Sequence, residues 1–266
     1  MNKNTFTKIN LLKGEVNVYD FGGMKLHAYK TNDYIDDEVF IVEKNGKAVV
    51  IESPCFFDNN IEFEQYIKEN KLNVQGMLLA YHMAGSGFLP GVKKYATKNA
   101  DEYGHTGGGK SLIDNFTAAF GSVFDKGVHT ITDYIEEGTV KIGGIDFNII
   151  QTSDAFDIEI PEINAVYTHM LGHDCHSIVA GNAHADSIIA QLNSYLDKGY
   201  TLILTSHYTP EDLKDVETKI SYLKKLKEIA ARCCNGEEFK NKIKNEYANY
   251  SGENYLDMTA GFFFTE

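Results

Sequence analysis

"EVFIVEKNGKAVVIES", residues 38–53, is the stretch of sequence that decides the fold. Two apolar runs flank Asn45 and Gly46 at its centre. An Asn-Gly pair favours a two-residue β-turn because both residues tolerate a positive φ, and runs rich in Val and Ile favour strands. The stretch therefore predicts a β-hairpin that turns at Asn45-Gly46.

The residues after this hairpin alternate between helical and strand patterns. Residues 58–60 offer an N-cap, and "IEFEQYIKENKL" (61–72) has the spacing of an amphipathic helix. The short apolar run "VQGMLLAYH" (74–82) is typical of a buried strand that ends at its histidine. We expect "GSGFLPGVKKYA" (85–96) to be a loop that runs into a helix, and "KSLIDNFTAAF" (110–120) to be a further helix.

The second half of the chain repeats this plan. "TVKIGGIDFNIIQT" (139–152) predicts two strands, and "INAVYTHML" (163–171) predicts another. An amphipathic helix follows over residues 184–199, then the apolar strand "TLILTSH" (201–207), then a helix with its N-cap and first residue at 209–210. Two halves of strands followed by helices predict an α/β fold, an αββα four-layer sandwich of two facing sheets with helices outside.

The bulk composition narrows the class of protein. The chain has 266 residues, enough for one large domain, and its net charge is −13. Such an acidic surface excludes nucleic acid and argues against an anionic membrane, because phosphates need basic partners. We expect a sandwich domain over residues 1–215 and a C-terminal helical extension over residues 216–266 that packs on it.

Targeting signals and cysteine spacing indicate the compartment. No apolar run approaches 18 residues, and the N-terminus lacks the apolar core of a signal peptide. The four cysteines lack a C-x-x-C spacing, so reduced thiols are expected. The prediction is a cytoplasmic protein, although a leader removed beforehand would leave no trace in the sequence.

A glycine-rich stretch raises the question of nucleotide binding. Gly104–Ser111 matches the P-loop pattern G-x-x-x-x-G-K-S, with Lys110 as its lysine. A working P-loop follows a buried strand, whereas residues 96–103 are polar, and Asp101 and Glu102 would repel a triphosphate. Nucleotide binding is therefore the weakest of the functional hypotheses.

Histidines at the ends of strands are the stronger signal. His82 closes one predicted strand and His207 closes another. Between them "THMLGHDCHS" (168–177) carries three more histidines and an aspartate, namely His169, His173, His176 and Asp174. Imidazole and carboxylate groups gathered at strand ends are the ligands of zinc, iron or manganese. One divalent metal is the cofactor that this pattern favours, and no metal at all is the alternative.

The order of these elements resembles the metallo-β-lactamase fold superfamily over about residues 35–215. The hairpin lies where that family has its opening strands, in a segment that usually ends in an acid. "LLAYHMAGSGFLPG" (78–91) lies where the family carries its H-x-H-x-D-H metal motif, and "LILTSHY" (202–208) resembles the strand that delivers the last histidine. The resemblance implies a hydrolase-like fold with a metal centre at the strand ends.

The sequence departs from that metal motif at most positions. Aligned at His82, the motif continues Met83-Ala84-Gly85-Ser86-Gly87, and alanine and glycine side chains cannot bind a metal. The middle histidine of the family falls at about Asp154 or Ala155, and the bridging carboxylate falls at about Met170. Only His82 and His207 match, so the standard dinuclear zinc site is not expected here.

A second resemblance is to the alkylsulfatase branch of the same superfamily. "TSDAFDIEIPEINAVY" (152–167) is similar to its T-E-A-P-A-E-like run and P-E-L segment. That branch uses carboxylates where other members use histidine. The resemblance therefore adds Asp154, Asp157 and Glu159 to the residues of interest.

Together these signals predict a divergent, hydrolase-like protein that binds or hydrolyses a small molecule. The expected metal ligands are His82, His169, His173, His176 and His207. Asp154 and Asp174 are candidates for moving a proton, and Tyr81, Tyr167 and Tyr208 are candidates for substrate contact. A small-molecule binding or sensor protein without catalysis is the alternative, and the C-terminal segment with Phe262–Phe264 could cover the pocket or form a homodimer face.

Overall fold

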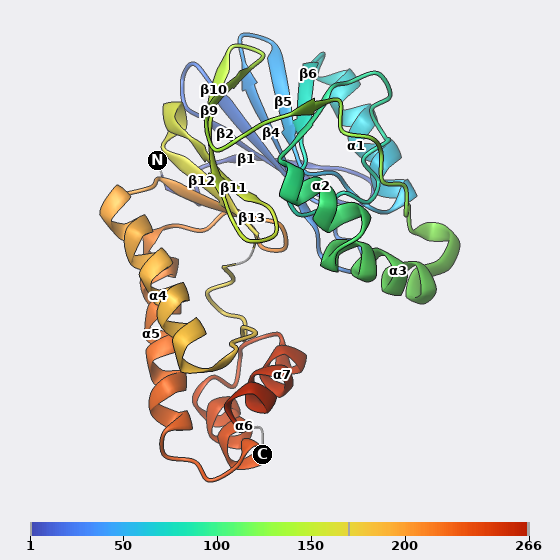
Figure 1. The fold of residues 1–266 in the computed structure, drawn as a ribbon. Helices are drawn as coiled ribbons and strands as arrows, with labels where there is room; N and C mark the ends of the chain where they lie inside the picture. Colours follow the sequence, from blue (N-terminus) through green and yellow to red (C-terminus); the bar gives the residue numbers. More distant parts are fainter. Residues whose placement is uncertain (1, 170, 265–266) are drawn as a thin grey trace. The chain divides into compact units, whose positions relative to one another are not determined.

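The computed structural model describes residues 2–169 and 171–264 (Figure 1). The chain divides into two compact units. The first, which we call the sheet unit, comprises residues 1–170 and 201–210; the second, the helical unit, comprises residues 171–200 and 211–266. The division at residues 215 and 216 that we expect from the sequence stays a prediction.

The first sheet of the sheet unit has eight strands in the order of the chain. They are β1 (Thr7–Asn10), β2 (Glu15–Asp20), β3 (Lys25–Lys30), β4 (Glu38–Lys44), β5 (Lys47–Ile51), β6 (Asn73–Leu78), β7 (Lys94–Ala96) and β8 (Asp133–Tyr134). The first five pair antiparallel, and β5–β6–β7–β8 pair parallel. The predicted hairpin is confirmed, since β4 and β5 join at Asn45 and Gly46, both with positive φ.

The second sheet has five strands in the order β13-β12-β11-β10-β9. They are β9 (Gly138–Ile142), β10 (Ile145–Gln151), β11 (Phe156–Ile160), β12 (Ala165–Thr168) and β13 (Leu202–Thr205). β12 and β13 pair in parallel, with Thr168 opposite Thr205. Their carboxyl ends therefore lie side by side, which matters because a histidine follows each strand closely.

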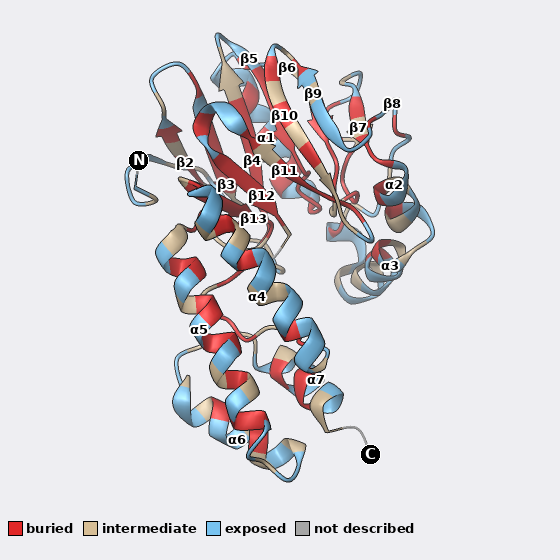
Figure 2. Ribbon diagram, turned by 60° about the vertical axis from the view of Figure 1, so that its left-hand side comes forward, coloured by how far each residue is buried: buried red, intermediate tan, exposed pale blue. Residues whose placement is uncertain are grey.

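One hydrophobic core joins the two sheets, and it includes many of the buried strand positions that Figure 2 colours red. Phe40 of β4 meets Tyr167 of β12 edge to face, with ring centroids 6.1 Å apart. Helix α1 (Phe57–Glu69) covers the first sheet, where its Phe63 stacks on Tyr29 of β3 at 4.7 Å. The predicted α/β class with two sheets is thus confirmed.

Local boundaries in the sheet unit differ from the prediction at two places. Helix α1 begins at Phe57, and its N-cap is Phe56 without a side-chain hydrogen bond, so the proposed cap at residues 58–60 is wrong. Residues 94–96, at the end of the segment that we expected to be a loop running into a helix, form β7 between β6 and β8, and the helix begins after it at Lys98. Pairing with two neighbouring strands outweighs the local preference of this short segment.

The P-loop pattern lies on two helices. Helix α2 (Lys98–His105) precedes α3 (Gly108–Phe120), so a helix stands where a P-loop needs its strand. Lys110 pairs with Asp114 of the same helix at 2.6 Å. This arrangement lacks the strand–loop–helix geometry that cradles phosphates.

The helical unit contains α4 (Gly181–Lys198), α5 (Leu213–Ala230), α6 (Gly236–Glu246) and α7 (Glu253–Phe263). The predicted helix over 184–199 is confirmed with its C-cap at Gly199, whose φ is 66°. The predicted start of the next helix at residues 209–210 is wrong, because Asp212 caps α5 in a capping box with Asp215. In the described part of the chain, no helix is long and apolar enough to cross a membrane.

Candidate metal centre

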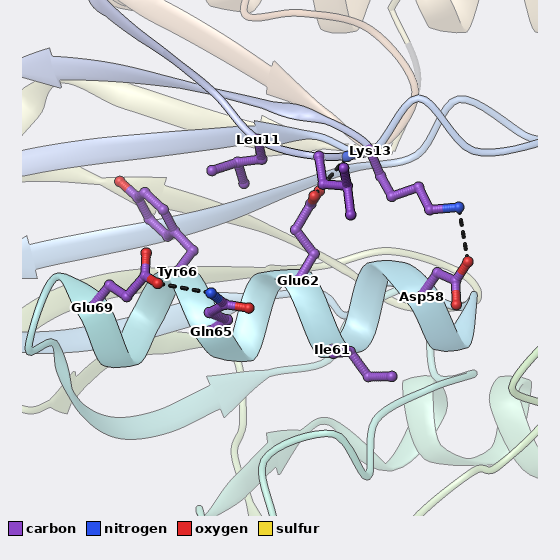
Figure 3. Close-up of a pocket in the computed structure, with 9 residues that line it drawn as sticks. Leu11, Lys13, Asp58, Ile61, Glu62, Gln65, Tyr66 and Glu69 are labelled. Atoms are coloured by element: carbon purple, nitrogen blue, oxygen red, sulfur yellow. Dashed lines mark hydrogen bonds and ion pairs between the residues drawn. The ribbon is translucent and has the colours of Figure 1, made fainter.

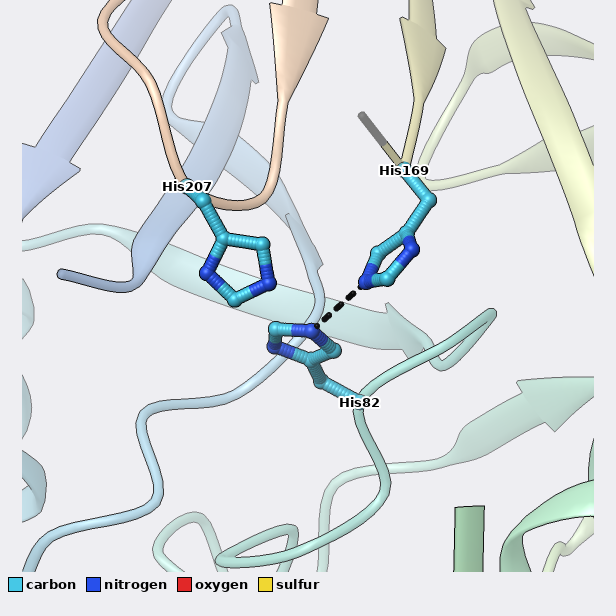
Figure 4. A group of neighbouring side chains, drawn as sticks. All are labelled: His82, His169 and His207. Carbon is cyan, nitrogen blue, oxygen red and sulfur yellow. Dashed lines mark hydrogen bonds between the residues drawn. The ribbon is translucent and has the colours of Figure 1, made fainter. Parts of the chain in front are cut away.

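Three histidines meet at the ends of three strands of the sheet unit. His82 follows β6, His169 follows β12 and His207 follows β13. Their rings point toward one another in Figure 4, with centroids 4.9–5.3 Å apart. One potential ligand nitrogen from each ring lies within 4.8 Å of the other two. We call His82, His169 and His207 the histidine triad.

Hydrogen bonds fix which nitrogen of each ring faces the centre. Nε2 of His82 lies 3.1 Å from Nε2 of His169. Nδ1 of His207 donates to the carbonyl of Ile35 at 3.2 Å, which leaves its Nε2 as the nitrogen for the centre. The ring of Tyr81 stacks on His169 at 4.7 Å and holds that ring in place. The three Nε2 atoms are thus the natural donor set.

Glu52 anchors the backbone that carries His82. Its side chain is fully buried and accepts the backbone N–H groups of Ala80, Tyr81 and His82 at 3.3, 2.8 and 3.0 Å. It also accepts the hydroxyl of Tyr167 at 2.6 Å. Burial raises the pKa of Glu52 to about 7, and these hydrogen bonds oppose the rise. We did not single out Glu52 from the sequence, although the resemblance placed an acid at the end of this segment.

The triad is neutral near pH 7. Burial and the rings of His207 and His169 lower the pKa of His82 well below its ordinary value. Burial and the ring of His207 lower the pKa of His169 to about 3. Burial also lowers the pKa of His207. Neutral imidazoles keep a lone pair for a metal, whereas protonated ones would repel it.

The residues present fit a metal ion. Two Nε2 ligands at the Zn–N distance of about 2.0–2.1 Å, in tetrahedral geometry, would lie about 3.3 Å apart. His82 and His169 have these atoms at 3.1 Å before any ion is considered. Three imidazoles suit zinc, iron, copper or nickel. Behind them the fully buried Oδ1 of Asp37 makes no hydrogen bond among the described residues, as expected where histidine ligands need a carboxylate partner.

The other positions of the family's metal motif, Ala84, Ser86 and Gly87, make structural contacts instead. The carbonyl of Ala84 accepts the hydroxyl of Ser53 at 2.8 Å, and the hydroxyl of Ser86 accepts the N–H of His129 at 3.2 Å. A Cβ added to Gly87 would lie 2.0 Å from the ring of His129. No ligand side chain fits at this position without moving that ring. The predicted position at Met170 lies outside the described residues.

The other predicted ligands lie in the helical unit. His173 pairs with Glu211 at 2.7 Å, and Asp215 lies 3.6 Å from the same Nδ1. Nδ1 of His176 lies 3.0 Å from the hydroxyl of Tyr222. Asp174 belongs to the same unit and accepts the N–H of Ser251 through its carbonyl. These contacts tie the segment 171–177 to α5, and the triad draws none of its rings from it.

The remaining predicted residues lie in the sheet unit. Asp154 is exposed in the turn between β10 and β11. Asp157 is buried in β11 and accepts the hydroxyl of Tyr81 at 3.2 Å, and Glu159 accepts the side chain of Asn148 at 3.1 Å. Tyr167 is fully buried, and the Tyr208 backbone N–H donates to the Thr205 hydroxyl. Tyr81 is the tyrosine in ring contact with the triad.

A separate hollow of about 290 Å³ lies along helix α1 (Figure 3). Leu11, Leu12 and Ile61 give it apolar walls, and Lys13 pairs with Asp58 at its edge. None of its lining residues is a histidine or cysteine. It therefore lacks the imidazole donors of the triad.

Comparison of structures finds proteins similar to this chain, whereas comparison of sequences finds none. No protein-family model matches the sequence, and no curated protein does. A solved structure of a sec-alkyl sulfatase matches 89% of this chain with a TM-score of 0.60 at 12% identity. The match covers 49% of the sulfatase, so this chain spans about half its length.

Two metallo-β-lactamases match over nearly their whole length. The enzyme from Erythrobacter litoralis, solved with β-mercaptoethanol in its active site, has a TM-score of 0.56 at 14% identity; the match covers 82% of this chain and 100% of that one. The enzyme from Pontibacter korlensis has a TM-score of 0.53 at 19% identity over 79% and 99% of the two chains. At such identities the likeness defines the fold. This chain has the metallo-β-lactamase fold, as the sequence predicts.

Proposed function

We propose that this protein is a metal-dependent hydrolase whose single metal ion is held by His82, His169 and His207. The convergence of these three imidazoles from three strand ends carries the proposal. The fold supports it, because similar folds belong to a sulfatase and to lactamases. The structural contacts at Ala84, Ser86 and Gly87 favour one metal over two.

The chemistry divides between the ion and the protein. A bound divalent ion supplies a Lewis acid that polarises the substrate and makes water a better nucleophile. The protein holds the three rings neutral, and Tyr81 and Glu52 restrain His169 and the backbone at His82. Asp154 is our candidate for moving a proton, and it contributes with burial to a raised pKa of Tyr103 in α2. Small esters, lactones, thioesters and sulfate or phosphate esters are the substrate classes to test.

Elemental analysis tests the proposal directly. The protein would be purified without an affinity tag or chelators, and its metal content measured. We expect about one equivalent of metal, lost in His82→Ala, His169→Ala and His207→Ala. His105→Ala is the matched control, because His105 lies in α2 beside Asp101 and outside the triad.

Two outcomes would overturn the proposal. One is a wild-type protein that takes up no metal after incubation with zinc, manganese or ferrous iron. The other is a metal content that persists in all three triad variants. A positive result justifies a hydrolysis screen over the substrate classes above, with the His207→Ala protein as the inactive reference.

A small-molecule binding protein without a metal is the second candidate. The observation that favours it is the 3.1 Å contact between Nε2 of His82 and Nε2 of His169, because these nitrogens can satisfy each other by a hydrogen bond. This alternative predicts no bound metal and a ligand-dependent rise in melting temperature. Thermal shift against a small-molecule library, run with and without chelator, separates the two candidates.

A further inference from the structure

The carboxylate of Asp37 lies behind two of the three triad histidines. Its Oδ1 is 3.4 Å from Nδ1 of His82 and 3.4 Å from Nδ1 of His207. The side chain is 0% exposed, and Oδ1 makes no well-aligned hydrogen bond within the described part of the chain. A buried carboxylate oxygen without a donor is costly, so the nearby Nδ1–H groups are its natural partners.

The other polar atoms of Asp37 are already engaged. Its Oδ2 accepts the thiol of Cys55 at 3.1 Å, and its backbone N–H donates to Asp33 at 3.3 Å. Its carbonyl accepts both the N–H and the hydroxyl of Thr31, at 3.0 and 2.8 Å. These contacts hold the residue rigidly before β4 and leave Oδ1 directed at the histidines.

We infer that Asp37 is a shared positioning residue: its Oδ1 accepts the Nδ1–H of His82 and shares the Nδ1–H of His207 with the carbonyl of Ile35, and so presents both Nε2 atoms to the metal. This inference rests on the proposed metal centre. A carboxylate that accepts from a histidine ligand fixes its tautomer and ring orientation and strengthens the ligand. Here one carboxylate serves two ligands that come from different sheets.

The contacts of Asp37 determine which ring nitrogen of each triad histidine carries the proton in the metal-free protein. His207 carries its proton on Nδ1, since the carbonyl of Ile35 can only accept. His82 carries its proton on Nδ1 toward Asp37, so its Nε2 accepts from Nε2–H of His169 across the 3.1 Å contact. One ring of the three must therefore change tautomer when the metal enters, and that ring is His169.

Three variants test this role by two measurements. Asp37→Ala removes the acceptor, and Asp37→Asn keeps the volume but removes the charge. Asp197→Asn makes the same change at an exposed carboxylate of α4 and is the matched control. The measurements are the zinc dissociation constant, by competition with a chelator, and the tautomer of each histidine in metal-free protein, by ¹⁵N NMR. Melting temperatures show whether each variant folds.

We expect zinc binding to weaken by about 10–100-fold in Asp37→Ala, by less in Asp37→Asn, and not in Asp197→Asn. Metal-free wild type should show Nδ1–H at His82 and His207, with the His82 preference lost in both Asp37 variants. Unchanged zinc binding and unchanged tautomers in a folded Asp37→Asn protein would overturn the inference, as would Nε2–H at His82 in wild type.

The tautomer measurement separates this inference from the proposed function. A wild type that binds no zinc but shows the expected tautomers, sensitive to Asp37, would contradict the metal centre and support the positioning role. A wild type that binds zinc with an affinity independent of Asp37, and with tautomers independent of it, would support the metal centre and overturn the positioning role.

Discussion

The buried side chain of Glu52 positions the backbone of residues 80–82 by hydrogen bonds. It has a positive φ of 66°, is fully buried, and accepts four hydrogen bonds from residues 80–82 and Tyr167. A strained backbone at such a position persists only when its surroundings hold it there. The side chain therefore links the end of β5 to the segment that presents His82.

Replacing Glu52 by Gln should be costly. One of its two oxygens becomes an NH₂ group, which then faces N–H or O–H donors in a buried site. We expect Glu52→Gln to lower the free energy of unfolding by about 2–4 kcal/mol, measured by urea denaturation. Glu136→Gln, the same change at an exposed position between β8 and β9, should be neutral. Equal stability of the two variants would contradict the anchoring role.

Lys219 gives the helical unit a pH dependence. Its ammonium is buried in α5, where it donates to the carbonyls of Gly172 and Cys175 at 2.9 and 2.6 Å. Burial lowers its pKa from 10.5 to about 8. Between these two pKa values the unfolded state binds the extra proton, so stability rises with pH, and the penalty of the buried charge is fully present below pH 8.

Comparison with Lys219→Met isolates this effect. From pH 7 to pH 10 the stability of wild type should rise relative to the variant by about 2 kcal/mol. Urea denaturation of both proteins at several pH values measures the difference, and the other titrating groups cancel between them. A difference that stays flat, or falls as pH rises, would contradict the assignment.

At the scale of elements, two strand connections offer a matched pair of glycines, Gly46 between β4 and β5 and Gly23 between β2 and β3. Gly46 has φ +75° and Gly23 has an ordinary φ, and a Cβ added at either would meet nothing within 4 Å. Gly46→Ala should destabilise by about 1–2 kcal/mol because the left-handed conformation disfavours a Cβ. Gly23→Ala should be neutral or slightly stabilising. Thermal denaturation measures both, and similar melting temperatures would show that the turn relaxes at no cost.

Elements that local residues determine could be predicted from the sequence, and elements that tertiary contacts determine could not. Local residues determine the hairpin turn (Asn45-Gly46) and the end of α4 (Gly199), and both predictions are confirmed. The start of α1 lacks a side-chain cap, and β7 exists because β6 and β8 flank it. Such features depend on tertiary contacts that no local pattern reports.

The same distinction between local pattern and tertiary contact applies to the histidine triad and the acids around it. Local patterns suggest all three histidines, His82 and His207 by their places at predicted strand ends and His169 by its place in the histidine-rich segment 168–177. Asp37 and Glu52 act through residues far away in the chain, for example over 30 positions from Glu52 to the N–H of His82. Acids are common on surfaces, so nothing in their neighbourhood distinguishes them before the fold is known. The other histidines of the segment, His173 and His176, contact Glu211 and Tyr222 in the helical unit.

At the scale of the whole molecule, the two compact units have buried residues of their own. In the helical unit Phe239 is fully buried, and its ring lies 5.8 Å from that of Phe263 and 5.6 Å from that of Phe264. Phe239→Ala should cost about 3–5 kcal/mol through the cavity it creates. Hydrogen exchange should speed up in α5–α7, while the strands of both sheets keep their protection. Phe262→Ala, at a ring 51% exposed, is the control.

Faster exchange in the strands to the same extent would show that the units unfold as one. Retained protection there, with unchanged metal content, would show that the triad needs only the sheet unit. The result also bears on the C-terminal segment, for which covering a pocket and forming a dimer face both remain predictions. The oligomeric state of the Phe262→Ala protein, by light scattering, tests the dimer face.

The triad draws together rings that are distant along the chain, and this sets a time order for folding. His82 and His169 are 87 positions apart and each lies beyond the end of a strand, so we expect their rings to meet only after both strands have formed. Closing so long a loop is entropically expensive and slow compared with forming the hairpin or a helix. A refolding experiment that follows cobalt absorbance beside far-ultraviolet circular dichroism would therefore see backbone structure first and the visible band last. The rate at which the cobalt band appears would then report when the second sheet forms against the first.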